Sequence, residues 1–406
     1  MSRIGLALAG GGPLGAVYEI GALVALEESI RGLDLNALDG YVGVSAGSFL
    51  AAGLANGMTA RQLCTAFIDG DSRHPDHVPA SMFTRPALAE FSDRLAALPG
   101  LAGRAAWQAL RGRPWLSALE QLGRSLPTGL FSHAPIEARL RSLLSAPGRS
   151  DDFRRLAATR GRRLVIVATD LDSGEAVPFG RPGHDHVPIS RAVAASAALP
   201  GLFPPVPVDG RWCVDGALKK TLHASVLLDD GVDLVLCLNP LVPFDATHPR
   251  RHRVLAGGEA PIPRIVDGGL PVVLSQTFRS LIHSRLELGL KGYGASHPRA
   301  DLLLFEPDHR DPAMFLANVF AYGQRRALAE HAYQATRADL RKRRSALRPA
   351  LARHGLELDE AALDDPHRRL LPQRRRAVAP PSPAAQALRR LDEVLDDLER
   401  ALSSTA

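Results

Sequence analysis

A serine lies at the centre of the pentapeptide Gly43-Val44-Ser45-Ala46-Gly47, which has the pattern G-x-S-x-G. A serine hydroxyl is a weak nucleophile unless the backbone presents it and a nearby base takes its proton. Glycines on both sides permit the sharp strand-to-helix turn that lifts such a serine clear of a sheet. In the alternative interpretation, Ser45 only caps the helix that follows. The pattern alone leaves both interpretations open, so the other parts of a catalytic site must be sought elsewhere.

A second glycine-rich segment, Gly10-Gly11-Gly12-Pro13-Leu14-Gly15, follows a short apolar run. It satisfies G-x-G-x-x-G, so a dinucleotide-binding oxidoreductase is one interpretation. Such a fold also needs an acidic residue about 20 residues later, at the end of the second strand. Asp34 is near this distance, but the residues around it make a poor central strand. In the other interpretation, backbone N–H groups of Gly11 and Gly12 stabilise negative charge that develops on a substrate at Ser45.

A proton acceptor for the serine is predicted at Asp215. This residue ends a short apolar stretch and precedes Gly216, a setting that aims a carboxylate at the end of a strand. An Asp-Gly pair is also a common turn, so this signal is ambiguous by itself. Of the histidines late in the chain, three are considered as the base, but their polar or helical contexts predict solvated side chains. They are His223, His283 and His331.

The elements that would position these residues are indicated by apolar runs and by helical periodicity. Predicted strands are residues 4–9, 41–45, 164–169, 175–179, 211–215, 234–238 and 302–305. Predicted helices are residues 16–26, 46–56 and 190–198, with further helices between 314 and 351. Two strand–helix units near the start and fully apolar later strands indicate a parallel sheet covered by helices. We therefore predict an α/β fold of three layers (α/β/α), with a central, mostly parallel sheet.

Changes in composition divide the chain into regions. Residues 1–335 are predicted to form the main domain, with a helical insertion or lid at 71–150. An Arg-rich helical tail is predicted for 336–406, with a Pro-rich linker at 377–385. Leucines spaced by three and four residues then predict a short heptad helix at 386–403. This helix either docks on the main domain or joins two copies of the chain into a homo-oligomer.

Composition and charge are ordinary for a globular enzyme. The 406 residues include 46% hydrophobic and 23% charged residues and carry a formal net charge of +6. Three widely spaced cysteines form no metal-type cluster and fit a reducing compartment. The first nine residues are too short for a signal peptide, and the uncharged stretch 40–60 fits a buried strand and helix rather than a membrane span. We expect a protein that is cytoplasmic or peripheral at a membrane, without a metal, an organic cofactor or a nucleic-acid partner.

Taken together, these segments resemble the patatin-like phospholipase family. The resemblance covers residues 4 to 330, and five motifs occur in the order that the family has. They are the glycine loop at 10–15, G-x-S-x-G at Ser45, Ala-Thr-Asp-Leu-Asp-Ser-Gly-Glu at 168–175, Ala-Ser-x-Ala-x-Pro-x-x-Phe-Pro-Pro at 195–205 and Asp-Gly-Ala at 215–217. Each motif is weak alone, but five in register are specific.

The resemblance implies roles for individual residues. Ser45 would be the nucleophile and Asp215 its partner, a dyad without histidine. The oxyanion hole would be formed by Gly10, Gly11 and Gly12, with further motif glycines at Gly15, Gly43, Gly47 and Gly216. Many family members carry Arg or Lys where this chain has Leu14, so a preference for a charged headgroup is left open.

The activity that the resemblance implies is that of a serine hydrolase acting on lipid acyl esters at a membrane or micelle surface. Phospholipase A or lysophospholipase cleavage through an acyl-enzyme is the main expectation. A neutral-lipid esterase or general carboxylesterase of the same fold is an alternative, and so is a non-catalytic lipid-binding protein. The dinucleotide-binding oxidoreductase remains as a rival from another class.

Overall fold

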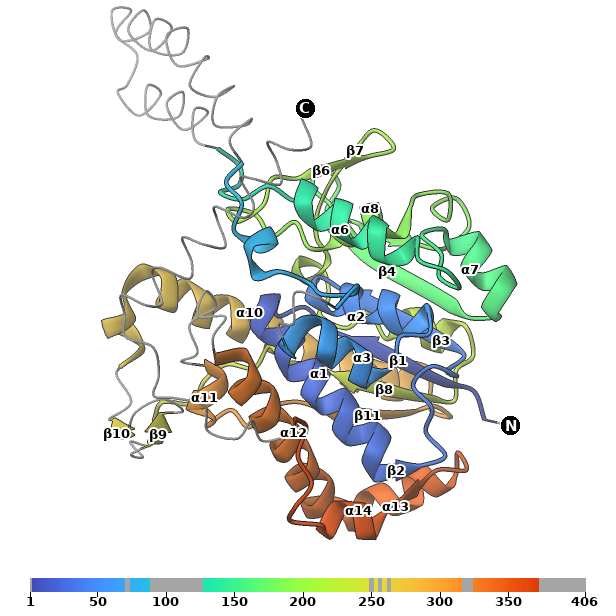
Figure 1. Ribbon diagram of the computed structural model, residues 1–406, viewed down its shortest axis with the longest axis vertical. Coiled ribbons are helices and arrows are strands. Elements are labelled where there is room, and N and C mark those ends of the chain that lie inside the picture. Colours follow the sequence, from blue (N-terminus) through green and yellow to red (C-terminus); the bar gives the residue numbers. More distant parts are fainter. Residues whose placement is uncertain are drawn as a thin grey trace, which may run out of the picture. The chain divides into compact units, whose positions relative to one another are not determined.

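An eight-stranded sheet forms the centre of the protein in the computed structural model (Figure 1). The order across the sheet is β11 (Asp301–Phe305), β8 (Leu234–Leu238), β1 (Ile4–Leu8), β3 (Gly40–Val44), β4 (Arg163–Asp170), β7 (Arg211–Asp215) and β6 (Val206–Val208), and β5 (Ala176–Phe179) also pairs with β4. The strands from β11 to β4 are parallel, whereas β5, β6 and β7 are antiparallel to the strands they pair with. The predicted α/β fold with a mostly parallel sheet is confirmed.

The structure describes residues 2–69, 74–87, 127–247, 252–254, 258–260, 264–315 and 324–371. Much of the predicted insertion, residues 88–126, therefore lies outside the described residues. The predicted Pro-rich linker and heptad helix, and with them the possible homo-oligomer contact, also lie outside them. The predicted start of the tail at residue 336 falls within helix α12 (Arg325–Lys342), and the chain up to Leu370 belongs to one compact unit with the N-terminal part.

The core strands are apolar because helices cover both faces of the sheet. Every residue of β3 and of β8 is buried, as expected of parallel strands that lack a solvated face. Their inward side chains join the core around Val42, Val165 and Val235. Burial of this kind stabilises the fold by about 25 cal/mol for each Å² of apolar surface removed from water.

Four helices are central to the arrangement around the site. They are α1 (Gly12–Ser29), α2 (Ala46–Ala55), α8 (Ile189–Ser196) and α10 (Gly269–Ser296). α1 begins directly after β1 and packs closely on α12, where a Cβ on Gly21 would lie 2.5 Å from the carbonyl oxygen of Ala329. α2 begins directly after β3, and α8 packs beside β4 (Figure 1). The loops of the two predicted strand–loop–helix units therefore lie at the same end of the sheet.

The remaining elements are short or peripheral. The helices are α3 (Ala60–Cys64), α6 (Ala134–Leu144), α7 (Phe153–Arg160), α9 (Ser225–Asp229), α11 (Pro312–Phe315), α13 (Arg344–Ala352) and α14 (Glu360–Asp364), with single turns at Thr65–Asp69, Ala80–Phe83, Gly216–Leu218 and Ile265–Gly268. Two small ribbons pair β2 (Ile30–Arg31) with β12 (Glu357–Leu358) and β9 (His252–Val254) with β10 (Gly258–Ala260).

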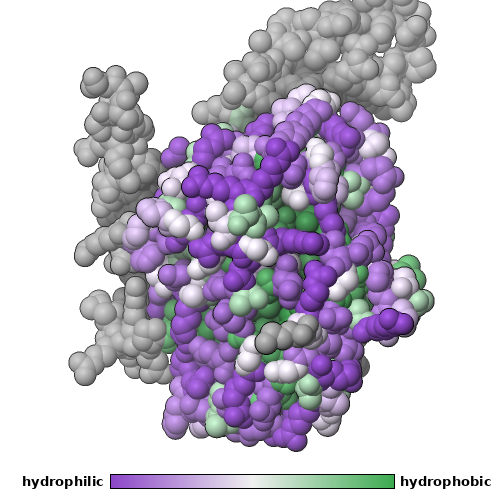
Figure 2. Space-filling model, turned by 90° about the vertical axis from the view of Figure 1, so that its right-hand side faces the viewer, coloured by the Kyte–Doolittle hydropathy of each residue, from purple (hydrophilic) through white to green (hydrophobic). Residues whose placement is uncertain are grey.

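Helix α10 was not indicated by the sequence pattern. Pro271 near its start and three glycines near its end weaken a helical signal. Several large apolar side chains on it are exposed, among them Leu270, Phe278 and Leu288. Among the described helices, none combines the length and the apolarity that a membrane span needs. One face of the protein is mostly hydrophilic, with hydrophobic residues showing between the polar ones (Figure 2).

Candidate active site

Ser45 occupies the turn between β3 and α2 in a backbone conformation that is rare for a residue with a side chain. Its φ is 50° and its ψ is −122°, which costs on the order of 1–3 kcal/mol unless the surroundings impose it. The flanking glycines allow the backbone segments around this turn to approach each other closely. A Cβ on Gly43 would lie 2.6 Å from Ser48 Cα, and one on Gly47 would lie 2.5 Å from the carbonyl oxygen of Ala9. The tight turn predicted from G-x-S-x-G is therefore present, and only glycine fits on either side of it.

A second serine, Ser196 at the end of α8, holds this turn in place. The backbone N–H of Ser45 donates to the Ser196 hydroxyl at 2.8 Å, and that hydroxyl donates to the Val167 carbonyl at 2.6 Å. Ser196 thus ties the turn to the neighbouring strand β4. Sequence reasoning assigned it no role, although it belongs to the motif at 195–205.

Asp215 ends β7 and is 3% exposed. Its backbone N–H donates to the Ala198 carbonyl at 3.0 Å, and its own carbonyl accepts from the Thr169 hydroxyl at 3.1 Å. Its carboxylate accepts from the Ala217 N–H at 2.9 Å, and the Ser45 side chain lies near enough to lower the pKa of the carboxyl. The structure therefore brings the side chains of Ser45 and Asp215, 170 positions apart in the sequence, close to each other.

The electrostatic state of Asp215 follows from its burial. Desolvation raises the pKa of this carboxyl to about 6, and hydrogen bonds from Ser45 and Ala217 oppose the rise. Removing a carboxylate from water disfavours its charged form, which makes it a stronger base. A carboxyl with a pKa near 6 is still ionised at neutral pH and can accept a proton more readily than a solvated aspartate.

The glycine loop lies against Ser45. A Cβ on Gly10 would lie 2.9 Å from Ser45 Cβ and 3.5 Å from its Oγ, so a side chain here would displace the serine. Gly11 is equally confined, because its Cβ would lie 2.7 Å from Pro240 Cγ. Gly12 has a φ of 60° and begins α1. Neither Gly11 nor Gly12 donates its N–H to an acceptor among the described residues.

The glycine loop lies at the N-terminus of α1, where the backbone carries partial positive charge. Unpaired N–H groups at the first turn of a helix carry partial positive charge and attract an anion. Leu14 lies in that turn and is 8% exposed, so it supplies packing and no charge.

The late histidines differ from the solvated side chains that we expected. His223 is buried, and its Nε2 lies 3.4 Å from the Gly216 carbonyl oxygen. Burial lowers the pKa of His223 to about 4, so its ring is neutral. A hydrogen bond with Asp311 raises the pKa of His331. His283 is half-buried on α10. The expectation was wrong because polar neighbours in sequence do not report tertiary burial.

The acidic residue that a dinucleotide site would need is absent from the strand next to β1. Asp34 is exposed in the loop after β2, which pairs with β12 and not with the central sheet. The strands that pair with β1 are β8 and β3, and β3, the next central strand along the chain, leads into Ser45. The glycine loop therefore faces a serine where a nucleotide-binding fold would place a carboxylate.

These features define a class of protein: a three-layer α/β fold with a strained serine after a central strand and a glycine loop beside it. Within that class, the chain belongs to the patatin-like phospholipase family, whose family model matches residues 6–228, more than half of the chain. The family predicted from the five motifs is thereby confirmed.

Comparisons with individual proteins give shorter or weaker matches. Uncharacterized NTE family proteins of Mycobacterium tuberculosis and Mycobacterium bovis are 35% identical over 75 residues, which are 18% of this chain and 19% of theirs. Among solved structures, VipD from Legionella pneumophila is 20% identical with a TM-score of 0.33, covering 62% of this chain and 51% of that chain. The type III effector ExoU is 19% identical with a TM-score of 0.33, covering 84% of this chain and 53% of that chain. The matches thus span about a fifth of the curated relatives and half of these solved chains.

Proposed function

We propose that the protein is a lipid acyl hydrolase of the phospholipase A or lysophospholipase type, with Ser45 as nucleophile and Asp215 as its base. The observation that carries this proposal is the position of the Ser45 side chain beside the buried Asp215 carboxyl, whose pKa it lowers. Membership of the patatin-like phospholipase family supports the lipid substrate.

In the first step, Ser45 Oγ attacks the acyl carbonyl carbon while its proton passes to Asp215. A carboxylate suffices as base here because burial raises its pKa to about 6 and holds it against the hydroxyl. No histidine is needed between the two residues, since their side chains lie beside each other. The strained turn keeps Oγ in one orientation, which lowers the entropy lost on reaching the transition state.

The negative charge that forms on the carbonyl oxygen is stabilised by the glycine loop. Gly10 lies against Ser45, and the N–H groups of Gly11 and Gly12 begin α1 without a partner among the described residues. Preorganised donors of this kind contribute about 3–4 kcal/mol each to transition-state stabilisation in enzymes where one was removed.

Collapse of the tetrahedral intermediate breaks the ester bond. The leaving alcohol takes the proton from Asp215, and the acyl group stays on Ser45 Oγ. Water then attacks the acyl-enzyme, gives one proton to Asp215 and releases the fatty acid, and that proton returns to Ser45. Both half-reactions use the same carboxylate and leave the enzyme unchanged.

The first turn of α1 bears on the substrate headgroup. Buried Leu14 gives the first turn of α1 no positive side chain, so binding of a phosphate headgroup there would depend on backbone N–H groups. A neutral glyceride or simple ester would fit such a turn equally well. Comparing hydrolysis of phospholipid, lysophospholipid and diacylglycerol in mixed micelles separates these substrates, and a preference for diacylglycerol would replace the phospholipase assignment.

Covalent labelling tests the nucleophile. A fluorophosphonate probe should label the purified chain at Ser45, with loss of labelling in Ser45→Ala. The neighbouring Ser48→Ala variant is unsuitable as a control because its hydroxyl bonds the Ser45 carbonyl, so the exposed Ser280 on α10 is mutated instead. A folded wild-type protein that takes no label would contradict the enzyme proposal and favour a lipid-binding role.

A further inference from the structure

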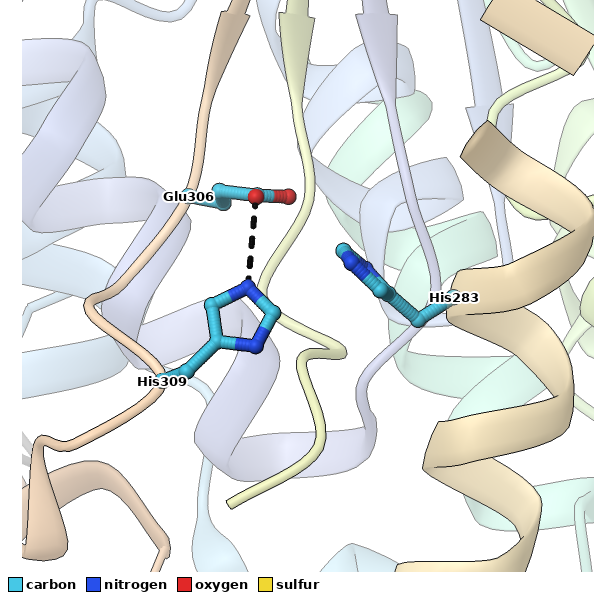
Figure 3. A group of neighbouring side chains, drawn as sticks. All are labelled: His283, Glu306 and His309. Atoms are coloured by element: carbon cyan, nitrogen blue, oxygen red, sulfur yellow. Dashed lines mark ion pairs between the residues drawn. The ribbon is translucent and has the colours of Figure 1, made fainter. Parts of the chain in front are cut away.

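Three side chains with metal-binding atoms converge at a site away from Ser45 (Figure 3). His283 projects from α10, and Glu306 and His309 come from the segment that follows β11. One ligand atom of each residue lies within 4.8 Å of those of the other two. The three residues are spread over 27 positions of the sequence, so no short sequence motif identifies them.

The distances approach those of a bound ion. His309 Nε2 lies 3.5 Å from Glu306 Oε1, whereas two ligands of a tetrahedral zinc ion are separated by about 3.4 Å. The rings of His283 and His309 stand edge to face with centroids 4.7 Å apart. The widest separation must close by about 1.4 Å for all three atoms to share one ion, which rotation of side chains can supply.

His283 carries an unsatisfied group that an ion would satisfy. Its Nδ1 is buried and has no hydrogen-bond partner in the described part of the chain. Its other nitrogen, Nε2, lies 3.4 Å from the Glu287 carboxylate one turn further along α10. A metal-bound histidine typically gives its second N–H to such a carboxylate, which fixes the ring and increases the basicity of the ligating nitrogen.

Glu306 is also held in place from behind. The side-chain amide of Asn239, which is fully buried after β8, donates to Glu306 Oε2 at 3.3 Å. This leaves Oε1, the atom nearest His309, for a ligand. Arg279, one turn before His283 on α10, donates to the Val242 carbonyl and lies over the ring of Phe315.

We propose that His283, Glu306 and His309 bind one divalent transition-metal ion, with zinc favoured by the two imidazoles and one carboxylate. Three protein ligands leave a fourth position for water. The ion would join α10 to the end of β11. Glu306 and Ser45 follow strands that are three positions apart in the sheet, a separation of about 14 Å, so the ion stabilises structure and does not touch the reacting acyl group.

Metal titration of the untagged full-length chain tests the site, independently of any hydrolase activity. After treatment with a chelator, the protein should bind one zinc ion per chain in competition with a chromophoric chelator. His309→Ala and the double variant His283→Gln/His309→Gln should weaken binding by at least about 100-fold, and Glu287→Gln by about tenfold. His186→Gln, a half-exposed histidine paired with Asp209, is the matched control and should bind like the wild type.

Two further measurements keep the test decisive. Cobalt substitution should give an absorption spectrum without a thiolate charge-transfer band, because the three ligands hold no sulfur and Cys64, Cys213 and Cys237 are all buried. Far-UV circular dichroism checks that the variants fold, and the conservative Glu306→Gln variant provides a second ligand deletion. Absence of zinc binding by the wild type, or equal binding by the folded double variant, would overturn the proposal.

Discussion

The end of the sheet carries two groups of polar side chains that differ in burial and in how they are held. Ser45 and Asp215 are 7% and 3% exposed, and backbone groups or buried hydroxyls fix both. The side chains of Glu306 and His309 are 23% and 37% exposed, and their neighbours are other side chains. Charge development at a reacting carbonyl requires fixed dipoles in a dry site, whereas ligands for an ion can adjust when it arrives. The first group therefore suits the proposed chemistry, and the second suits the proposed binding of an ion.

The largest expected effect on hydrolysis comes from removing the charge of Asp215 while keeping its size. Asp215→Asn keeps the size of the side chain but cannot accept the Ser45 proton, so ester hydrolysis should fall by about 10³-fold or more. Turnover of a chromogenic short-chain ester measures this. Asp209→Asn, at a half-exposed carboxylate in the β6–β7 turn, is the control and should keep wild-type activity. Retention of a tenth of the activity by Asp215→Asn would mean that another group is the base.

A methyl group should be harmful when added beside Ser45 and stabilising when added at an open position on α10. Gly10→Ala places Cβ 2.9 Å from Ser45 Cβ and should lower turnover by about 10²-fold through displacement of the nucleophile. Gly289→Ala on α10 meets no atom within 4 Å and should raise the free energy of unfolding by about 0.5–1 kcal/mol. Denaturant unfolding and turnover of both variants check the pair. Equal activity of the two variants would contradict the close approach at Gly10.

The pH dependence should report the buried carboxylate. Because the pKa of Asp215 is raised to about 6, kcat/KM should fall tenfold per pH unit below that value as the base becomes protonated. The contribution of this carboxyl to folding stability depends on pH in the opposite direction. A carboxyl whose pKa is higher in the folded state favours folding at low pH, and this contribution is lost as the pH rises from about 4 to about 6. A kcat/KM profile that is flat between pH 5 and 8 would contradict the raised pKa of Asp215.

A smaller effect is expected from the residue that supports the turn. Ser196→Ala removes the acceptor of the Ser45 N–H and the donor to Val167. Leaving these buried groups unpaired should cost about 1–3 kcal/mol of stability, and turnover should fall by about tenfold as the turn loosens. Ser296→Ala, whose hydroxyl bonds the Gly292 carbonyl on an exposed part of α10, is the control. Thermal melts and fluorophosphonate labelling rates measure the two variants, and identical melts would contradict the role of Ser196.

The smallest effect on hydrolysis is expected from zinc. An ion at 100 times its dissociation constant should stabilise the folded state by about 2.7 kcal/mol and raise Tm by a few degrees. The hydrolysis rate should change by less than twofold because the ion lies three strands from Ser45. A tenfold change in rate would contradict this separation and show that the two groups are coupled, for example through Pro240, which follows β8 and packs on Gly11.

Prediction from the sequence succeeded for the central strands, whose apolar residues are consecutive in the chain. Strands 4–9, 41–45 and 234–238 are observed within one residue as β1, β3 and β8, because parallel strands buried on both faces appear as uninterrupted apolar runs. It failed for α10, whose glycines and Pro271 obscure its periodicity. It also failed for His223, because burial depends on what packs against a residue from elsewhere in the chain.

The sequence by itself determined the tight turn at Ser45, the glycine loop and the family, since each depends on residues that are adjacent in the chain. Glycine tolerates backbone conformations and close approaches that other residues do not, so its positions are visible without a structure. Only the tertiary structure decided that Asp215 lies beside Ser45, that Ser196 supports the turn and that His283 faces Glu306 and His309. These contacts join distant elements through sheet order and helix packing, and no spacing along the chain encodes them.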